Sequence, residues 1–168
     1  MFNLPAFAQQ EDKEKPAIIP LLCWDIANPL LEKRVQIHND IQQIGNLART
    51  HDWQSDINFK KLLADNYTVV VTNLSQEIIW VSQSFHAMTG YDIDESIGKI
   101  PSFLQGEKTN LQTKLLLKEK LTKLEISEAR ILNYRKNGET YWCGIKISPI
   151  QNSQGVFTHY IAIEKEVN

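Results

Sequence analysis

The chain has 168 residues, enough for one domain with a substantial core plus an appendage of about 60 residues. Its formal net charge is −2, and lysines and glutamates are interspersed, which argues against a nucleic-acid-binding face. No apolar run approaches the ~20 residues that span a bilayer, and the first ten residues lack the pattern of a secretory signal. We therefore expect a cytoplasmic protein with neither a nucleic-acid nor a membrane partner.

The two cysteines, Cys23 and Cys143, lie far apart in sequence and match no metal-ligand spacing. Two free thiols in a reducing compartment are the simplest interpretation, and an intermolecular bridge stays open. Residues 1–28 are rich in Gln, Glu, Lys and Pro in their first part and show little periodicity. We predict that residues 1–28 form a flexible or extended lead-in.

A helix is predicted from Pro29 to about Thr50, because apolar positions recur there with a 4-3-4-3-4 spacing. After a break near Trp53, Ser55 or Asp56 can cap a second, shorter helix. The first helix has two interpretations, which are a helix packed on its own domain and a dimerisation helix. Residues 29–65 are thus predicted to be an N-terminal helical extension. The periodic positions are Leu30, Arg34, Ile37, Ile41, Ile44 and Ala48.

The rest of the chain has the pattern of an antiparallel sheet with helices on one face. Two β-branched runs predict a hairpin, and three later strands are joined by the Asn137-Gly138 turn and by a looser one. Between the two groups of strands lie a short helix and a longer Lys/Leu helix. This order predicts an α+β fold with a five-stranded antiparallel sheet. The predicted strands are 67–73, 77–81, 128–136, 139–150 and 156–167, and the predicted helices are 82–88 and 109–124.

The stretch from Thr89 to Asn110 is broken by Gly98, Pro101 and Gly106, so it cannot form one regular element. We interpret it as short helical turns wrapped around either a packed core or a ligand.

Three separated motifs resemble one family in the correct order. They are Phe85-x-x-x-Thr89-Gly90-Tyr91 with the later Gly98, then Phe103-Leu104-Gln105-Gly106, and then the segment from Leu132 to Gly138. Together they resemble the PAS superfamily, with the closest likeness to its light-oxygen-voltage (LOV) branch of flavin-binding blue-light sensors. The resemblance implies a PAS domain over residues 66–168.

The resemblance also fixes which way the strands face. In LOV domains the asparagine that corresponds to Asn133 points into the ligand pocket. Because side chains alternate between the two faces of a sheet, this one residue fixes which face the others on these strands point to. The residues expected inside are Ile131, Asn133, Tyr141, Cys143, Ile145, Ile147, Tyr160, Ala162 and Glu164. An outer apolar patch needs a cover, which we expect to be the N-terminal helix, a second copy in a homodimer, or a partner protein. This patch is Leu132, Tyr134, Trp142, Phe157, Ile161 and Ile163.

The resemblance implies that the photochemistry of LOV domains is lost here. Pro101 stands where the family has the cysteine that bonds to the excited flavin, and Ser102 stands in place of the phosphate-binding arginine. Gln105 and Asn133 match family contacts to the flavin ring, whereas Cys143 and Glu164 replace an asparagine and a glutamine. A buried glutamate must be paired or protonated. Gln105, Asn133, Cys143 and Glu164 are the candidate pocket residues.

We expect no cofactor, with flavin mononucleotide (FMN) as the alternative and a small polar metabolite or ordered water also open. Haem is disfavoured because residues 109–124 contain no histidine. The sequence contains no nucleophile–base pair, metal cluster or phosphate loop, so no enzymatic activity is predicted.

The leading hypothesis is a PAS sensory or protein-interaction module that acts in a signalling pathway by dimerisation or partner docking. The alternative hypothesis is a non-covalent flavin sensor that responds to redox state or to light. Whether the chain is complete or part of a longer protein stays open.

Overall fold

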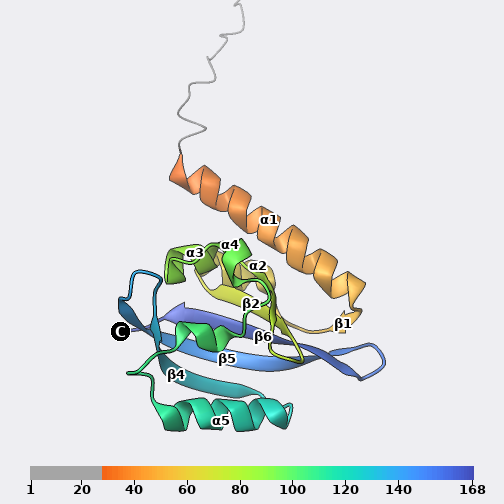
Figure 1. Cartoon of the computed structure of the whole chain (residues 1–168). Helices are drawn as coiled ribbons and strands as arrows, with labels where there is room; N and C mark the ends of the chain where they lie inside the picture. The colour runs from red at the N-terminus through yellow and green to blue at the C-terminus, as the bar shows by residue number, and fades with distance from the viewer. Residues whose placement is uncertain (1–27) are drawn as a thin grey trace, which may run out of the picture.

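The computed structural model describes residues 28–168, so Cys23 and almost all of the predicted lead-in lie outside the described residues. Helix α1 spans Pro29–Thr50, as predicted, and Asn28 caps it by accepting a hydrogen bond from the Leu30 amide at 3.0 Å. Within residues 28–168 no helix is long and apolar enough to cross a membrane. Figure 1 shows α1 running from a free N-terminal end down to the sheet.

Between α1 and the PAS-like segment lies a short strand, β1 (Trp53–Gln54), which pairs with the end of β5 and was not predicted. Two residues are too few to show an alternating pattern, so only the tertiary pairing reveals this strand. Helix α2 spans Phe59–Ala64. The prediction that Ser55 or Asp56 caps it is wrong, because the Asn58 side chain accepts from the Lys61 amide at 3.0 Å.

The sheet is antiparallel, and its order is β1-β5-β6-β2-β3, with β4 pairing along another part of β5. The α+β prediction is confirmed, and β1 adds a short sixth strand to the five that were predicted. The three expected antiparallel connections are present, between β2 and β3, between β4 and β5, and between β5 and β6. The other strands are β2 (Thr68–Asn73), β3 (Ile78–Val81), β4 (Ser127–Tyr134), β5 (Thr140–Asn152) and β6 (Phe157–Glu166).

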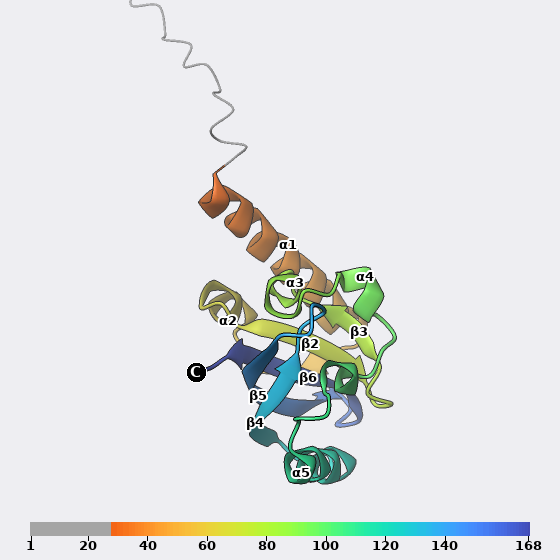
Figure 2. The ribbon, with the colours of Figure 1, turned by 60° about the vertical axis from the view of Figure 1, so that its left-hand side comes forward.

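The remaining helices pack on the inner face of the sheet, and the two that follow β3 also lie beside α1 (Figures 1 and 2). The glycine- and proline-broken stretch forms short turns, as predicted, and Gly90 ends the first of them with a positive φ of 75°. Phe85 and Leu104 anchor these turns on Val70 of the inner face. The helices are α3 (Ser84–Thr89), α4 (Ile93–Ser96), the 3-10 helix η1 (Pro101–Leu104) and α5 (Leu111–Thr122).

The outer face is covered in part by α1. Ile44 of α1 is 1% exposed and packs with Val69, Val71 and Ile161 of the sheet. The interpretation that α1 packs on its own domain therefore holds for its second half. Its first turns are different, since Leu30 and Val35 are 69% and 51% exposed.

The part of the outer patch on β4 and β5 is less well covered. Trp142 is 41% exposed, and the Arg130 guanidinium lies 4.5 Å from its ring centre. Leu132 and Tyr134 are half-buried. The cover of the outer face is therefore incomplete within the described chain.

Trp53 fixes the end of α1 to the sheet. Its Nε1–H donates to Nδ1 of His159 at 3.1 Å, and the rings of His51 and His159 lie 4.3 Å apart. Burial, with a smaller contribution from His51, lowers the pKa of His159 to about 4. The imidazole of His159 is therefore neutral at pH 7 and can accept the tryptophan hydrogen bond.

Candidate functional site

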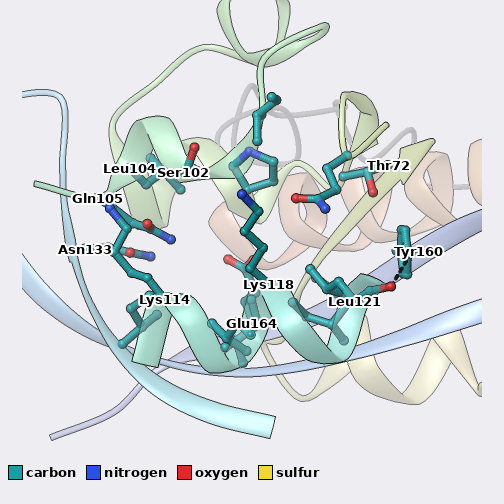
Figure 3. Close-up of a pocket in the computed structure, with 18 of the residues that line it drawn as sticks. Thr72, Ser102, Leu104, Gln105, Lys114, Lys118, Leu121, Asn133, Tyr160 and Glu164 are labelled. Atoms are coloured by element: carbon teal, nitrogen blue, oxygen red, sulfur yellow. Dashed lines mark hydrogen bonds between the residues drawn. The ribbon is translucent and has the colours of Figure 1, made fainter. Parts of the chain in front are cut away.

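A cavity of about 510 Å³ lies between the inner face of the sheet, η1 and α5 (Figure 3). Its volume is within the range of small-molecule sites in proteins. Strands β2, β4, β5 and β6 supply one wall, and Leu117 and Leu121 of α5 supply part of the other. Most of its residues are apolar, so each polar side chain that enters it has few local partners.

Three of the four candidate residues line this cavity, namely Gln105, Asn133 and Glu164. Cys143 does not line it. The thiol is fully buried in the neighbouring cluster with Met88 and Tyr141, and Sγ lies 3.8 Å from Oε2 of Glu164. Strand alternation therefore predicted that Cys143 points toward the inner face of the sheet. On that face the thiol packs among buried residues such as Met88 and Leu117 and does not reach the cavity.

Glu164 is 3% exposed, and its neighbours across the sheet are Thr68 on β2 and Ile145 on β5. Desolvation raises the pKa of its carboxyl group to about 7, and the hydrogen bond from Cys143 opposes this only weakly. Near pH 7 the side chain is therefore present both as a neutral acid, which can donate a hydrogen bond, and as a carboxylate, which only accepts.

Burial also raises the pKa of the Cys143 thiol far above its ordinary value, and the nearby charge of Glu164 adds to this effect. The thiolate is the reactive form of cysteine, and these surroundings disfavour it. The burial of Cys143 in an apolar cluster is typical of a core cysteine.

Gln105 carries a buried atom that has no partner among residues 28–168. Its Oε1 accepts no hydrogen bond, although η1 fixes the backbone of Gln105 through a 3.0 Å bond to the Ser102 carbonyl. The other polar groups nearby are engaged to different degrees. Asn133 Nδ2 reaches the Tyr141 hydroxyl at 3.4 Å, and the Tyr160 hydroxyl donates to the Leu121 carbonyl at 2.7 Å.

Two lysines of α5, Lys114 and Lys118, also line the cavity. Figure 3 shows Lys118 extending from α5 into it. Because LOV domains often have a second arginine near this position, the resemblance indicates Lys118 as a possible phosphate contact, but it does not indicate Lys114. The spacing of four residues, which puts both on one face of a helix, is the signal that could have found it.

The cavity residues do not fit the flavin–cysteine chemistry of LOV domains. Pro101 occupies the start of η1, and the lining residues include neither a cysteine nor an arginine. Glu164 adds an ionisable carboxyl group to the lining, and its carboxylate form cannot donate a hydrogen bond to a ring edge. Within the described residues, no group of three or more potential ligands could hold a metal ion.

Comparison with known proteins identifies the family. The family model described as a PAS domain matches residues 66–168. The chain belongs to the PAS domain family. This confirms the resemblance that the sequence motifs carried, and the boundaries of the match agree with those expected for the domain.

The PAS domain is 36% identical over 90 residues to a blue-light-activated histidine kinase of Brucella anthropi, a match that covers 54% of this chain and 18% of the kinase. It is 33% identical over 97 residues to the bacterioopsin transcriptional activator of Halobacterium salinarum, covering 58% of this chain and 14% of that protein. The chain thus spans less than a fifth of the length of these relatives.

Solved structures of LOV domains share the fold. The LOV domain of the blue-light-activated histidine kinase EL346 of Erythrobacter litoralis has a TM-score of 0.58 and 28% identity, over 61% of this chain and 96% of that one. The dark structure of the Aureochrome1 LOV photoreceptor has a TM-score of 0.61 and 27% identity, over 68% and 86%. The neighbours therefore support a LOV-type PAS domain with a role in signalling.

Proposed function

We propose that this PAS domain is a sensory module that has the LOV scaffold without the flavin–cysteine photochemistry. One observation carries this proposal. Cys143, the one cysteine among residues 28–168, is buried outside the cavity lining, and the resemblance to LOV domains matches Pro101 to their photoactive cysteine. The module would respond to occupancy of the cavity and pass the signal to a partner or to a second copy.

Illumination tests this proposal. The chain incubated with FMN and exposed to blue light should show no light-dependent loss of flavin absorbance and no gain of mass in the denatured protein, because no reactive thiol reaches the cavity. A reversible absorbance change with a covalent flavin would contradict the proposal. The Cys143→Ser variant would then show whether Cys143 is the nucleophile.

A second candidate function is a non-covalent flavin sensor of redox state or light. The unpartnered Gln105 Oε1 in a cavity of about 510 Å³ supports it, because these features suit a bound molecule. The lysines on α5 could lie beside the FMN phosphate, although a lysine lacks the planar fork of an arginine. Titration of the chain with FMN, followed by the quenching of flavin fluorescence, tests this function.

The output of the module would use the part of α1 that its own domain leaves free. Leu30, Leu31 and Val35 are 69%, 43% and 51% exposed and continue the apolar stripe of the helix. A groove of about 850 Å³ separates this half of α1 from α2, α3 and α4. Two turns of isolated helix are marginal in water, which favours a second copy of the chain as their cover.

Charge on this exposed stripe should prevent dimerisation. We expect the Leu31→Asp, Val35→Asp double variant to lower the dimer affinity by at least about tenfold, because it places carboxylates in an apolar contact. The molar mass measured by light scattering over a range of concentrations checks this. The control variant carries Asn39→Asp and Gln42→Asp, which add the same charge at exposed polar positions. If the wild-type chain stays monomeric at every concentration, the proposal that α1 forms a dimer contact is wrong.

A further inference from the structure

Two buried groups of the cavity lining have acceptor capacity that the described residues leave almost unused. Gln105 Oε1 is buried and unpartnered among residues 28–168, and within the same residues the Glu164 carboxyl has a hydrogen bond only from a thiol at 3.8 Å. A thiol is a weak donor. Unsatisfied buried acceptors are costly, so a bound molecule that supplies N–H groups would gain from contact with these two side chains.

The cavity lining also contains two cations. Lys114 and Lys118 lie one helical turn apart on α5, and both line the cavity. Neither forms an ion pair with a carboxylate within residues 28–168, whereas Lys123 on the same helix pairs with Glu119 at 2.6 Å. An anionic group on the ligand would suit these lysines.

Much of the remaining lining is aliphatic. It includes Ile131, Ile145 and Ile147 of the sheet and Leu115 and Leu117 of α5. Two aliphatic walls, one on a sheet and one on a helix, suit the two faces of a flat ring. The expected ligand therefore has a ring body, an edge that donates hydrogen bonds and an anionic group.

We infer that the cavity binds an anionic heterocycle whose ring edge carries an amino group beside a ring N–H, as guanine and pterin do, with this edge on Glu164. A carboxylate can accept two parallel N–H bonds from such an edge. Gln105 lines the same cavity, and Lys118 would contact the phosphate or carboxylate of the ligand. The inference rests on the proposed function, because it takes this cavity to be the sensory site.

The same chemistry distinguishes glutamate from the glutamine that LOV domains have at the matching position of the resemblance. A glutamine amide and the neutral acid of Glu164 each offer a donor and an acceptor, whereas the carboxylate of Glu164 offers acceptors alone. Two neighbouring N–H groups need two acceptors. Only the carboxylate form of Glu164, which glutamine lacks, can therefore accept both bonds of the proposed edge.

Calorimetric titration of the full chain with guanosine 5′-monophosphate (GMP) and with 6-carboxypterin tests the inference and distinguishes the two sources of the same edge. We expect at least one of them to bind. Inosine 5′-monophosphate, which lacks the amino group, should bind about tenfold more weakly than GMP if the nucleotide is the ligand. For the pterin, the matched compound is the same bicycle without its amino group. Binding that ignores the amino group in both pairs, or that is absent for both ligands, would overturn the inference.

Two variants locate the ligand. Glu164→Gln should weaken the binding of the amino compound about tenfold and reduce its advantage over the compound without the amino group. Lys118→Ala should weaken the anionic ligand but leave guanosine, which has no phosphate, unchanged. Lys120→Ala is the matched control, because Lys120 does not line the cavity. Equal losses for Lys118→Ala and Lys120→Ala would place the anion elsewhere and overturn the assignment.

The result is separable from that of the illumination experiment. A light-induced flavin bond would contradict the proposed function, whatever the nucleotide titrations show. Tighter binding of FMN than of GMP and 6-carboxypterin, with no light-induced bond, would overturn only the ligand assignment.

Discussion

Replacing Glu164 by glutamine should stabilise the folded domain at pH 8 by up to about 3 kcal/mol and have little effect near pH 4.5. Burial raises the pKa of this carboxyl from its ordinary value of 4.5 to about 7. Between these two values the folded state keeps the proton while the unfolded chain releases it. The free energy of unfolding of the wild type therefore falls as the pH rises through this window, and glutamine removes that dependence.

Urea denaturation at several pH values measures this effect. The matched control is Glu107→Gln, which makes the same chemical change at an exposed position and should alter the free energy of unfolding by less than about 0.5 kcal/mol. Equal pH profiles for the wild type and the Glu164→Gln variant would show that the carboxyl is already paired or hydrated in the folded state. The assignment of Glu164 as a desolvated carboxyl group without an adequate hydrogen-bond donor would then be wrong.

Replacing Ile44 by alanine should destabilise the domain by about 3 kcal/mol. Ile44 is 1% exposed and fills the space between α1 and the outer face of the sheet, where it packs with Trp53 and Val69. Truncating a buried isoleucine removes apolar burial and leaves a cavity, which together cost roughly 2–5 kcal/mol. The measurement is the free energy of unfolding from urea denaturation.

Leu30→Ala is the control for this prediction, because it is a similar truncation on the same helix at a side chain that is 69% exposed. It should change the free energy of unfolding by less than about 0.5 kcal/mol. If both variants cost the same, the two halves of α1 would be equally supported. The division of the helix into a docked half and a free half would then fail.

Strand β6 connects these two predictions. Its residues alternate between the faces, so that Glu164 and Ala162 face the cavity while Ile161 and Ile163 face α1. A ligand that moves the strand at Glu164 would also move the surface on which α1 packs. This geometry provides a physical route from the proposed ligand site to the proposed dimer surface.

The sequence predicted most of this architecture because the decisive patterns are local. The β-branched runs predicted the strands, and Asn137-Gly138 predicted a hairpin. Asn133, which the resemblance assigns to the inside, predicted which residues of the last strands point to each face of the sheet. Glu164 and Gln105 were then found at the cavity, as expected. Period-two alternation carries this information over long distances in a strand.

Other features depend on contacts that no local pattern records. Strand β1 is visible only through its pairing with β5, and Asn58 caps α2 because the Ser55 hydroxyl instead accepts from the Ile57 amide at 3.2 Å. Cys143 has the expected orientation, but the packing of α3 and α5 decides that it lies beside the cavity. Side-chain packing between elements, rather than the direction of a strand, sets the boundary of a pocket.

The most direct test of the central claim is the flavin content of the freshly purified chain, measured from its absorbance spectrum and from the small molecules released on denaturation. We predict a colourless protein that releases no flavin, because the resemblance matches Glu164 and Pro101 to groups of the LOV flavin site. A yellow protein whose flavin bonds covalently to the chain in blue light would contradict the central claim, whereas bound FMN without such a bond would favour the second candidate function.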